Sequence, residues 1–334
     1  MKKIGNPAEL TEIVNGFRLS RIILTAYELK IFDCLAGRSC SSADIASLIN
    51  TDPRATDRLM NVLASLGLLD KQHGLFINSD FAGKFLVSSS PAFLGGLAHT
   101  ADLWRKWDTL TQVIRKGSAI ELEDNFDDRG ATWIEAFIAA MHARGVSQGR
   151  ELASLLDLSK TRRSLDVGGG SGAFSFAFIE KNPAIQAIIF DLPNVIPVTQ
   201  KYIDRAGLNA SVATKAGNYL ADSLGTGFDL ILMSAIIHIN DPEENRQLVQ
   251  KGADALEPGG QLVIMDHLMN EDRTEPLQGA VFAINMLVGT KKGDTYTLQE
   301  ISSWMNEARL EDIKSINAPS GTQYLTGIKP GRKI

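Results

Sequence analysis

The chain opens on an apolar stripe with helical spacing. Leu10, Ile13, Val14 and Phe17 fall at positions i, i+3, i+4 and i+7, which places them on one face of an amphipathic helix. Because a helix of this kind gains stability mainly by burying its apolar face, the stripe needs a partner surface. The pattern therefore predicts an N-terminal helix that packs against a partner.

Two capped helices follow this first element. Ser41 and Asp44 form a capping-box-like pair at the start of a short helix, and Asp52 followed by Pro53 is the pattern of an N-cap with proline at the first helical position. The second helix is expected to end at Gly67 as its C-cap. The residues expected on its inward face are Leu59, Val62, Leu63 and Leu66.

A short hairpin completes this part of the chain. Strands are expected over residues 68–70 and 75–78, and the turn between them falls at His73-Gly74. Helix, helix and hairpin in this order are typical of a winged helix-turn-helix, a fold that serves both DNA recognition and packing.

The charges of the second helix decide between these two uses. In the segment that would enter a DNA groove, Arg54 and Arg58 are offset by Asp52 and Asp57. The positive field that would attract phosphates is therefore largely cancelled. We expect a packing or dimerisation module with no nucleic acid partner.

A helical stretch connects this unit to the rest of the chain. Residues 88–91, Ser-Ser-Ser-Pro, mark a boundary, after which helical patterns run over 97–114 and 133–156, joined by a polar, acidic loop around 121–129. Its large side chains belong to a core or wall a pocket next to the following domain. They are Trp104, Trp107, Trp133, Phe137 and Met141.

From residue 164 the pattern changes to short apolar strands separated by helical stretches. The strands are expected over 164–167, 187–191, 230–233 and 262–266. Such alternation is typical of a parallel sheet covered by helices on both faces. A ligand of this sheet is expected at the carboxyl ends of its strands.

Composition agrees with two globular domains. The chain has 334 residues, of which 44% are hydrophobic, and a formal net charge of -5. This charge argues against extensive binding to nucleic acid, which needs clustered Lys and Arg. Cys34 and Cys40 are the only cysteines and lack CxxC spacing, so we expect buried free thiols and no metal or redox site.

No targeting or membrane segment is expected. The basic start of the chain meets Asn6, Pro7, Glu9 and Glu12 before any apolar run of the ~7 to 15 residues that a signal peptide needs. No segment approaches the ~20 apolar residues of a membrane span. We therefore expect a cytoplasmic protein with no membrane partner.

The first strand of the sheet leads into a glycine-rich loop. Residues 165–172 read Leu-Asp-Val-Gly-Gly-Gly-Ser-Gly, and a ligand can approach such a backbone closely, next to the free amides of a helix N-terminus. Gly168-x-Gly170-x-x-Ala173 also satisfies the dinucleotide pattern, with Asp191 at roughly the ~20-residue distance of a ribose-binding acid. NAD and S-adenosylmethionine (SAM) both contain a ribose and an adenine, so the loop alone leaves both possible.

Three further features favour SAM. Asp166 lies at the strand end before the glycines, where a carboxylate suits the methionyl ammonium group and repels a diphosphate. Asn218 and Tyr219 follow a further strand position, between the strands expected at 187–191 and 230–233, where an amide and a ring suit the adenine edge. Residues 256–260, Leu-Glu-Pro-Gly-Gly, form a turn that is common in methyltransferases before the strand at 261–266.

These motifs together resemble the small-molecule O-methyltransferase family, which includes plant caffeic acid, animal acetylserotonin and bacterial polyketide-tailoring enzymes. The resemblance rests on residues 166–172, on Phe-Asp-Leu-Pro at 190–193, on the His238 segment 236–244 and on the turn at 256–260. It covers nearly the whole chain. It implies an α/β fold, with a class I Rossmann-like SAM methyltransferase domain and an N-terminal all-α/winged-helix dimerisation domain.

The resemblance also implies the domain limits and the assembly. A winged-helix dimerisation domain is expected over 1–87, and a helical connector that contributes to the substrate pocket and the dimer over 88–160. The SAM-binding methyltransferase domain is expected over 161–334. Two chains should form a homodimer by interlocking through their N-terminal halves.

Residue roles follow from the same resemblance. His238, which comes just after the strand at 230–233, is the expected general base, although its spacing alone also suits a structural histidine. Asp266, at the end of the next strand, is expected to orient it, whereas His267 should turn to the opposite side of the chain. No metal is expected.

The expected cofactor-binding residues are Asp166, Gly168, Gly170, Gly172, Asp191, Leu192, Asn218, Tyr219 and Ser234. The expected substrate-binding residues are Trp104, Phe137, Met141, Phe282, Asn285 and Met286.

Two positions depart from the family pattern. Ile239 follows the histidine where the family commonly has Asp, and Thr295 stands in the region where the family has a further carboxylate. The site is therefore less acidic than that of the plant relatives. It suits another substrate class, a greater reliance on proximity than on base catalysis, or loss of methyl transfer with SAM binding kept.

Proton affinity favours an acidic acceptor. A histidine of ordinary pKa, about 6.5, must take a proton from a phenol of pKa about 10, a gap worth roughly 5 kcal/mol. The gap to an aliphatic hydroxyl, nearer to water at ~15.7, is more than twice as large. An aromatic hydroxyl is the favoured acceptor. The alternatives are transfer to nitrogen or carbon, and a SAM-responsive transcription regulator that uses the winged helix.

Overall fold

The computed structural model describes residues 3–120 and 130–331, so the loop expected around 121–129 lies outside the described residues. The chain divides into two compact units, one up to Arg105 and one from Lys106 onward. This division falls inside the expected connector, within a helix. In the part of the chain that the structure describes, no helix is long and apolar enough to cross a membrane.

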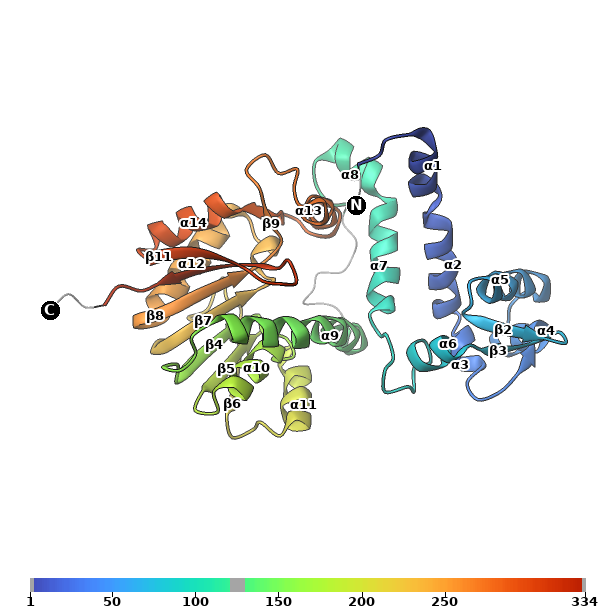
Figure 1. Ribbon diagram of the computed structural model, residues 1–334, viewed down its shortest axis with the longest axis horizontal. Helices are drawn as coiled ribbons and strands as arrows, with labels where there is room; N and C mark the ends of the chain where they lie inside the picture. The colour runs from blue at the N-terminus through green and yellow to red at the C-terminus, as the bar shows by residue number, and fades with distance from the viewer. Residues whose placement is uncertain (1–2, 121–129, 332–334) are drawn as a thin grey trace. The chain divides into compact units, whose positions relative to one another are not determined.

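The first unit is helical with a small antiparallel sheet (Figure 1). Its strands are β1 (Cys40–Ser41), β2 (Leu69–Gln72) and β3 (Leu75–Asn78), in the order β1-β3-β2. Its helices are α1 (Pro7–Asn15), α2 (Phe17–Glu28), α3 (Ile31–Cys34), α4 (Ser42–Ile49), α5 (Pro53–Ser65) and α6 (Asp80–Phe85), and α7 (Leu97–Asp108) starts here and runs past the division.

The expected N-caps and hairpin turn of this unit are confirmed. Ser41 and Asp44 form a reciprocal capping box at the start of α4, and the Asp52 carboxylate accepts a hydrogen bond from the Ala55 amide at the start of α5. His73 and Gly74 join β2 to β3 with φ of 49° and 81°, in the left-handed region that two-residue hairpin turns use. Local polar chemistry therefore sets these boundaries.

The burial expectations are wrong for Leu66 and for the two cysteines. Leu66 is 37% exposed because α5 ends at Ser65, which leaves Leu66 as the cap and Gly67 one residue beyond it with φ of 72°. Met60, which has helical spacing to Leu63, is buried instead. Cys34 and Cys40 are free, as expected, but only partly buried.

The N-terminal stripe is helical but interrupted. The helix ends at Asn15 and a second begins at Phe17, with Gly16 between them. The stripe side chains are 48% to 60% exposed, so their own unit leaves them largely uncovered. These residues are Leu10, Ile13, Val14 and Phe17.

The second unit is built on a seven-stranded sheet in the order β11-β12-β8-β7-β4-β5-β6. The strands are β4 (Arg163–Val167), β5 (Gln186–Asp191), β6 (Val212–Ala216), β7 (Phe228–Ser234), β8 (Leu256–Met265), β11 (Glu311–Asn317) and β12 (Gln323–Ile328), and the short β9 (Leu268–Met269) and β10 (Tyr296–Thr297) pair apart from it. The helices are α8 (Leu110–Lys116), α9 (Ala131–Leu155), α10 (Ala173–Lys181), α11 (Ile196–Ala206), α12 (Pro242–Ala255), α13 (Leu277–Gly289), α14 (Leu298–Glu307) and the 3₁₀ turn η2 (Ile237–Ile239).

The parallel arrangement expected for the four predicted strands is confirmed, and the sheet has in addition an antiparallel edge. Strands β4 to β8 are parallel, whereas β12 runs antiparallel to β8 and β11 antiparallel to β12. A short hairpin joins β11 to β12, and only antiparallel neighbours can be joined without a crossover. The helix expected over 97–114 is likewise two helices, α7 and α8, on either side of Thr109.

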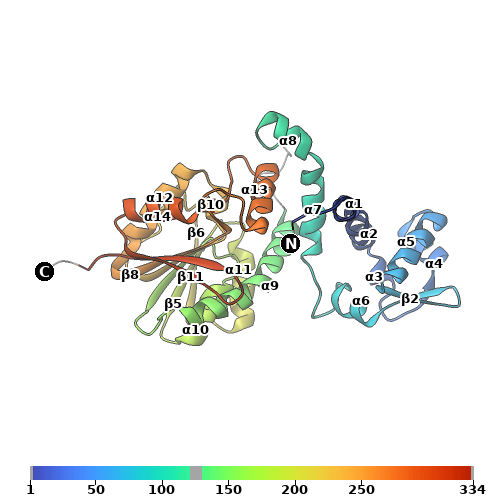
Figure 2. The same cartoon turned by 45° about the horizontal axis from the view of Figure 1, so that its top comes forward.

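Helices cover both faces of this sheet. Successive residues of β7 point to opposite sides, so that Ile231 and Met233 belong to the core under α12 and α14, and Leu230 and Leu232 to the core under α9, α10 and α11. Figure 2 shows the two helical layers on either side of the strands. The carboxyl ends of β4, β5, β7 and β8 meet at one edge, which positions the candidate site.

Candidate active site

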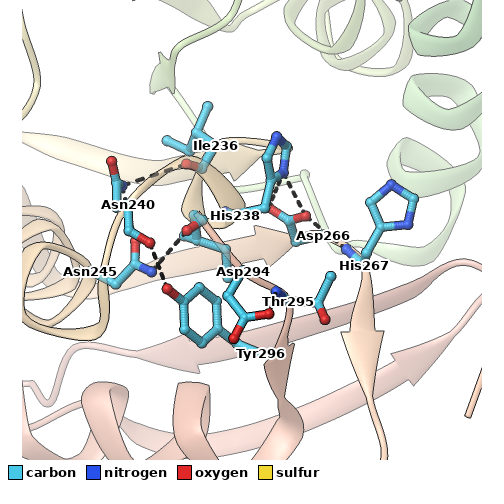
Figure 3. A network of polar contacts seen from close by, with 10 residues as sticks. Ile236, His238, Asn240, Asn245, Asp266, His267, Asp294, Thr295 and Tyr296 are labelled. Carbon is cyan, nitrogen blue, oxygen red and sulfur yellow. Dashed lines mark hydrogen bonds and ion pairs between the residues drawn. The ribbon is translucent and has the colours of Figure 1, made fainter. Parts of the chain in front are cut away.

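A histidine and an aspartate from two adjacent strand ends lie in contact (Figure 3). The His238 Nδ1 atom lies 2.8 Å and 3.0 Å from the two carboxylate oxygens of Asp266, which also accepts a hydrogen bond from the His238 amide at 3.3 Å. The two side chains are 12% and 3% exposed. Strand pairing explains the contact, because β7 ends four residues before His238 and the parallel β8 ends just before Asp266.

The charge of Asp266 fixes how the imidazole uses its protons. Burial raises the pKa of Asp266, but the positive charge and hydrogen bond of His238 outweigh this, and the net effect is a lowered pKa. An ionised carboxylate only accepts hydrogen bonds, so Nδ1 is the donor. In the neutral ring this leaves Nε2 with a lone pair, as a general base requires.

The position of His267 differs from expectation. Its ring centroid lies 6.5 Å from that of His238, and Phe282 contacts both rings, stacking on His267 at 3.8 Å and meeting His238 edge-on at 4.9 Å. The alternation of strand side chains does not apply here because β8 ends at Met265. His267 is therefore a neighbour of the His238–Asp266 pair.

The glycine loop is held in place from several elements. The Gly168 amide donates to the Phe190 carbonyl at 2.7 Å, and the Gly170 amide to the Asp191 carboxylate at 2.8 Å. The Thr199 hydroxyl donates to the Gly170 carbonyl at 2.6 Å. Thr199 was not predicted as a site residue, because its partner lies 29 residues away and no motif includes it.

The φ angles and close packing of the loop explain its glycines. Gly168 has φ of 67°, and a Cβ there would lie 2.5 Å from Cγ2 of Ile236 in the segment that leads to His238. Gly172 has φ of 79°, and its Cβ would lie 2.4 Å from Cδ1 of Ile189. A side chain at either position would have to displace the loop. The loop thus follows the sheet edge closely, as a backbone that cradles a ligand must.

Two carboxyl groups lie against this loop. Asp166 is 3% exposed and accepts a hydrogen bond from the Ser175 hydroxyl at 2.9 Å. Burial, supported by the negative charge of Asp191, raises the pKa of Asp166 to about 7 against the effect of the Ser175 bond. Burial also raises the pKa of Asp191 to about 6, although the Gly170 and Leu192 amides donate to it. A cationic ligand group at this edge would find carboxyls whose ionised forms it stabilises.

The other expected cofactor residues lie on neighbouring loops of the same unit. Ser234 is the last residue of β7, and the Asn218 side chain accepts a hydrogen bond from the Leu220 amide. The Tyr219 hydroxyl donates to Asn240 Oδ1 at 3.2 Å. Leu192, partly buried, packs with an apolar cluster of α9 and α11. Leu192, Asn218 and Tyr219 thus come from the loops after β5 and β6, and Ser234 from the end of β7.

The expected substrate residues differ in what they contact. Phe282 touches His238, and the Asn285 Oδ1 atom accepts a hydrogen bond from the Trp107 indole at 2.9 Å. Met286 is 8% exposed and acts as packing, and Phe137 stacks on Trp133 at 5.2 Å. Only Phe282 is thus seen beside the His238 pair. Met141 is partly buried on α9, and Trp104 belongs to the first unit, where Arg21 lies over its ring.

The positions that depart from the family pattern are both described. Ile239 is 47% exposed at the end of η2, and Thr295 is 2% exposed. The residue before Thr295, Asp294, does carry a carboxylate. Its backbone amide donates a hydrogen bond to the His238 carbonyl at 3.0 Å. Its side chain, however, pairs with Arg273 at 3.5 Å. No carboxylate other than Asp266 is seen to contact the His238 ring among the described residues.

Comparisons with known proteins cover both units. Residues 125–310 match the family model of the O-methyltransferase domain, and residues 11–88 match that of the O-methyltransferase dimerisation domain. The chain is 28% identical over 331 residues to 3-hydroxy-5-methyl-1-naphthoate 3-O-methyltransferase of Streptomyces sahachiroi, which covers 97% of this chain and 95% of that protein.

One further relative and one solved structure are also similar to this chain. L-tyrosine C(3)-methyltransferase of Streptomyces lavendulae is 33% identical over 289 residues, 82% of this chain and 78% of its own. The crystal structure of human N-acetylserotonin methyltransferase in complex with SAM has a TM-score of 0.82 at 23% identity and covers 99% of this chain and 100% of its own. At that identity the structural likeness establishes the fold.

Proposed function

Because this chain belongs to the O-methyltransferase family, we propose that it transfers a methyl group from SAM to the phenolic hydroxyl of a small aromatic or polyketide-like metabolite. The observation that carries the proposal is the contact between His238 and Asp266 at the carboxyl edge of the sheet. The first match, a naphthoate 3-O-methyltransferase, supports the acceptor class.

The residues around the glycine loop suit SAM. Gly168, Gly170 and Gly172 would let SAM approach the backbone of the loop closely. Asp191 would accept hydrogen bonds from the ribose hydroxyls of SAM. Asp166 would ionise against the methionyl ammonium group. Leu192, Asn218, Tyr219 and Ser234 would complete the cofactor site, with Asn218 and Tyr219 at the adenine edge.

The proposed reaction is a direct displacement. When bound, SAM supplies an electrophilic methyl group on a positive sulfonium. His238 takes the acceptor's hydroxyl proton on Nε2 as the oxygen attacks the methyl carbon, and Asp266 stabilises the imidazolium that forms. Phe282 would position the acceptor ring, with Asn285, Met286, Phe137, Met141 and Trp104 as the further acceptor residues. Holding the two reactants together contributes more than the base, up to ~7 to 11 kcal/mol.

The remaining parts of the proposal concern the assembly. The dimerisation-domain match supports a homodimer through the winged helix over residues 1–87. The connector over 88–160 would line the acceptor site, and residues 161–334 would bind SAM. The protein would act in the cytoplasm.

The test of this function needs no guessed acceptor. The purified protein is incubated with native-host extract and isotopically labelled SAM, and products are read by mass spectrometry. We expect a labelled aromatic product, and we expect His238→Ala to lower turnover by at least ~10²-fold. Its affinity for the product S-adenosylhomocysteine (SAH), measured by calorimetry, should be unchanged. Equal turnover in the variant would reject His238 as the base, and absence of SAH binding would reject the cofactor.

A second acceptor chemistry is favoured by one relative. The L-tyrosine C(3)-methyltransferase of Streptomyces lavendulae, which is 33% identical to this chain, methylates a carbon atom by its name. Methylation at an aromatic carbon would use the same pair, since His238 would then deprotonate the hydroxyl that activates the ring. The methyl group would leave the sulfur for the ring carbon, and the hydrogen of that carbon would leave as a proton, with a proton returned to the oxygen. The NMR shift of the labelled methyl group in the product separates an O-methyl from a C-methyl.

A further inference from the structure

A buried set of side chains holds the turn that bears His238. Asn240 and Asn245 are 2% and 0% exposed, and Tyr296 is 2% exposed. The Asn245 amide donates to the Ile237 carbonyl at 2.8 Å, and the Tyr296 hydroxyl to the Asn240 carbonyl at 2.5 Å. Figure 3 shows these side chains gathered on the side of η2 away from Asp266.

This turn depends on its neighbours for its conformation. η2 spans only residues 237–239, and a single 3₁₀ turn has weak internal hydrogen bonding. It is entered through Ala235, whose φ of 54° is uncommon for a residue with a side chain. The surrounding side chains therefore determine where the imidazole lies.

Asn240 connects this set to a second loop. Its Nδ2 atom donates to Asn245 Oδ1 at 3.0 Å, and its Oδ1 atom accepts the hydrogen bond from the Tyr219 hydroxyl. Both ends of a buried amide are thus used. Nδ2 also donates to the Ile236 carbonyl at 3.5 Å, whereas loss of the Tyr219 hydroxyl would leave the buried Oδ1 atom without its described partner. Burial raises the pKa of Tyr219 to about 12, so its hydroxyl remains a donor at neutral pH.

The loop of Tyr219 is positioned independently of this bond. The Lys251 ammonium group on α12 donates to the carbonyls of Tyr219, Leu220 and Asp222 at 3.0 Å, 2.6 Å and 3.1 Å. The hydroxyl of Tyr219 is therefore not needed to keep its loop in place. Its one described partner is in the turn that bears the base.

We propose that Tyr219 and Asn240 are positioning residues that transmit occupancy of the adenine end of the cofactor site to the orientation of His238. The inference rests on the proposed function, which puts the adenine edge at Tyr219. A ligand that moves or fixes the Tyr219 ring shifts the donor of Asn240, and the turn follows because the amide must keep its partner. Cofactor binding then prepares the base before the acceptor arrives.

Adenosine is the probe that tests this link, since it has the adenine and ribose of SAM but no methionyl group to reach the imidazole. The chain has five histidines, so the ring signals are few in an NMR spectrum. The His238 signal is assigned by its absence from the His238→Gln variant. In the parent protein, saturating adenosine is expected to shift this signal.

The decisive variant is Tyr219→Phe, which keeps the ring and removes the hydroxyl. We expect it to bind adenosine and SAH within about threefold of the parent, while the His238 response to adenosine disappears. Turnover should fall about tenfold with little change in the KM for SAM, within the ~5- to 150-fold range of ordinary coupling between sites. Tyr202→Phe, which removes a hydroxyl from α11 in the same unit, is the matched control and should respond as the parent does.

The outcomes separate this inference from the function. A His238 response in Tyr219→Phe equal to that of the parent would overturn the link and leave the methyltransferase proposal intact. Loss of adenosine binding in that variant would also overturn it, because the hydroxyl would then serve the ligand. Failure of the parent to bind either adenosine or SAH would remove the cofactor site and the link together.

Discussion

At the scale of single residues, the tautomer of His238 is the feature on which the proposed chemistry depends. The Asp266 carboxylate contacts only Nδ1 of the ring, so it orients the base without touching the atom that takes the proton. An amide in its place has a donor as well as an acceptor. It therefore stabilises either tautomer, including the one with the proton on Nε2.

Asp266→Asn is accordingly expected to lower kcat by ~10² to 10⁴-fold while SAH affinity is unchanged, because Nε2 loses its lone pair in the wrong tautomer. Steady-state kinetics and calorimetry measure the two quantities. Asp266→Glu, which keeps the carboxylate, should recover part of the loss. If the Asn variant turned over within threefold of the parent, Asp266 would be no more than a packing residue.

The pKa of Asp166 gives a second prediction at this scale. Its folded pKa of about 7 exceeds the value of about 3.9 expected in the unfolded chain, so the folded state holds the proton more tightly. The stability from this group is complete below about pH 4 and is lost as the pH rises towards about 7. The loss is at most about 4 kcal/mol, at ~1.36 kcal/mol for each pH unit.

Asp166→Asn cannot ionise, so the Tm of the ligand-free variant relative to the parent should rise between pH 4 and about 7 and then level off. Thermal unfolding across this range measures it. A Tm difference that stays constant with pH would mean that Asp166 is ionised in the folded protein throughout. SAH should reverse the trend if its ammonium group meets this carboxyl, and calorimetry in buffers of different ionisation enthalpy would then detect proton release.

At the scale of elements, the sequence predicted what short-range chemistry determines. Caps at Ser41, Asp52 and the hairpin turn at His73-Gly74 were identified because each is complete within a few residues. Strand β11 was missed because its residues are mostly exposed, with none of the apolar alternation that marks an inner strand.

The site divides in the same way. The positions of His238 and Asp266 followed from the ends of their strands, although they are 28 residues apart. Asn240 lies in the His238 segment and Tyr296 in no motif, but their contact was not identified because it joins positions 56 residues apart. Buried polar pairs of this kind produce no repeating pattern of residues by which a sequence could predict them.

The glycine loop offers a matched pair of substitutions. Gly168 and Gly207 both have φ of 67°, but a Cβ at Gly207 would meet no atom within 4 Å, whereas one at Gly168 would lie 2.5 Å from Ile236. Each alanine costs about 1 to 2 kcal/mol for its left-handed backbone. Only Gly168→Ala also displaces the loop or the segment before His238.

We therefore expect Gly168→Ala to weaken SAH binding by at least about tenfold, or ~1.4 kcal/mol, and Gly207→Ala to leave it unchanged. Calorimetry measures the affinities for SAH. Thermal unfolding measures the loss of stability, which should be present in both variants because both place an alanine in the left-handed region. Equal SAH affinity in both would show that the loop tolerates a side chain, and the cradle assigned to these glycines would be wrong.

At the scale of the whole molecule, the uncovered stripe on α1 and α2 is the feature that a single chain leaves unexplained. Four apolar side chains at helical spacing are each about half exposed, and exposed apolar groups that recur in this way mark interaction sites. Residues 11–88 match a dimerisation domain, so a second copy of this chain is the expected partner.

Val14 is the most exposed residue of the stripe, at 60%, and Leu48 on α4 is equally exposed, at 57%, outside it. Val14→Glu should convert the dimer to a monomer, because the partner surface would have to bury an unpaired carboxylate. Leu48→Glu adds the same charge and should remain dimeric. Light scattering after size exclusion reads the mass, and far-ultraviolet circular dichroism confirms that both variants fold. Dissociation by Leu48→Glu alone would move the interface from the stripe to the surface around α4 and leave the stripe without a partner, whereas dimers from both variants would place the contact elsewhere.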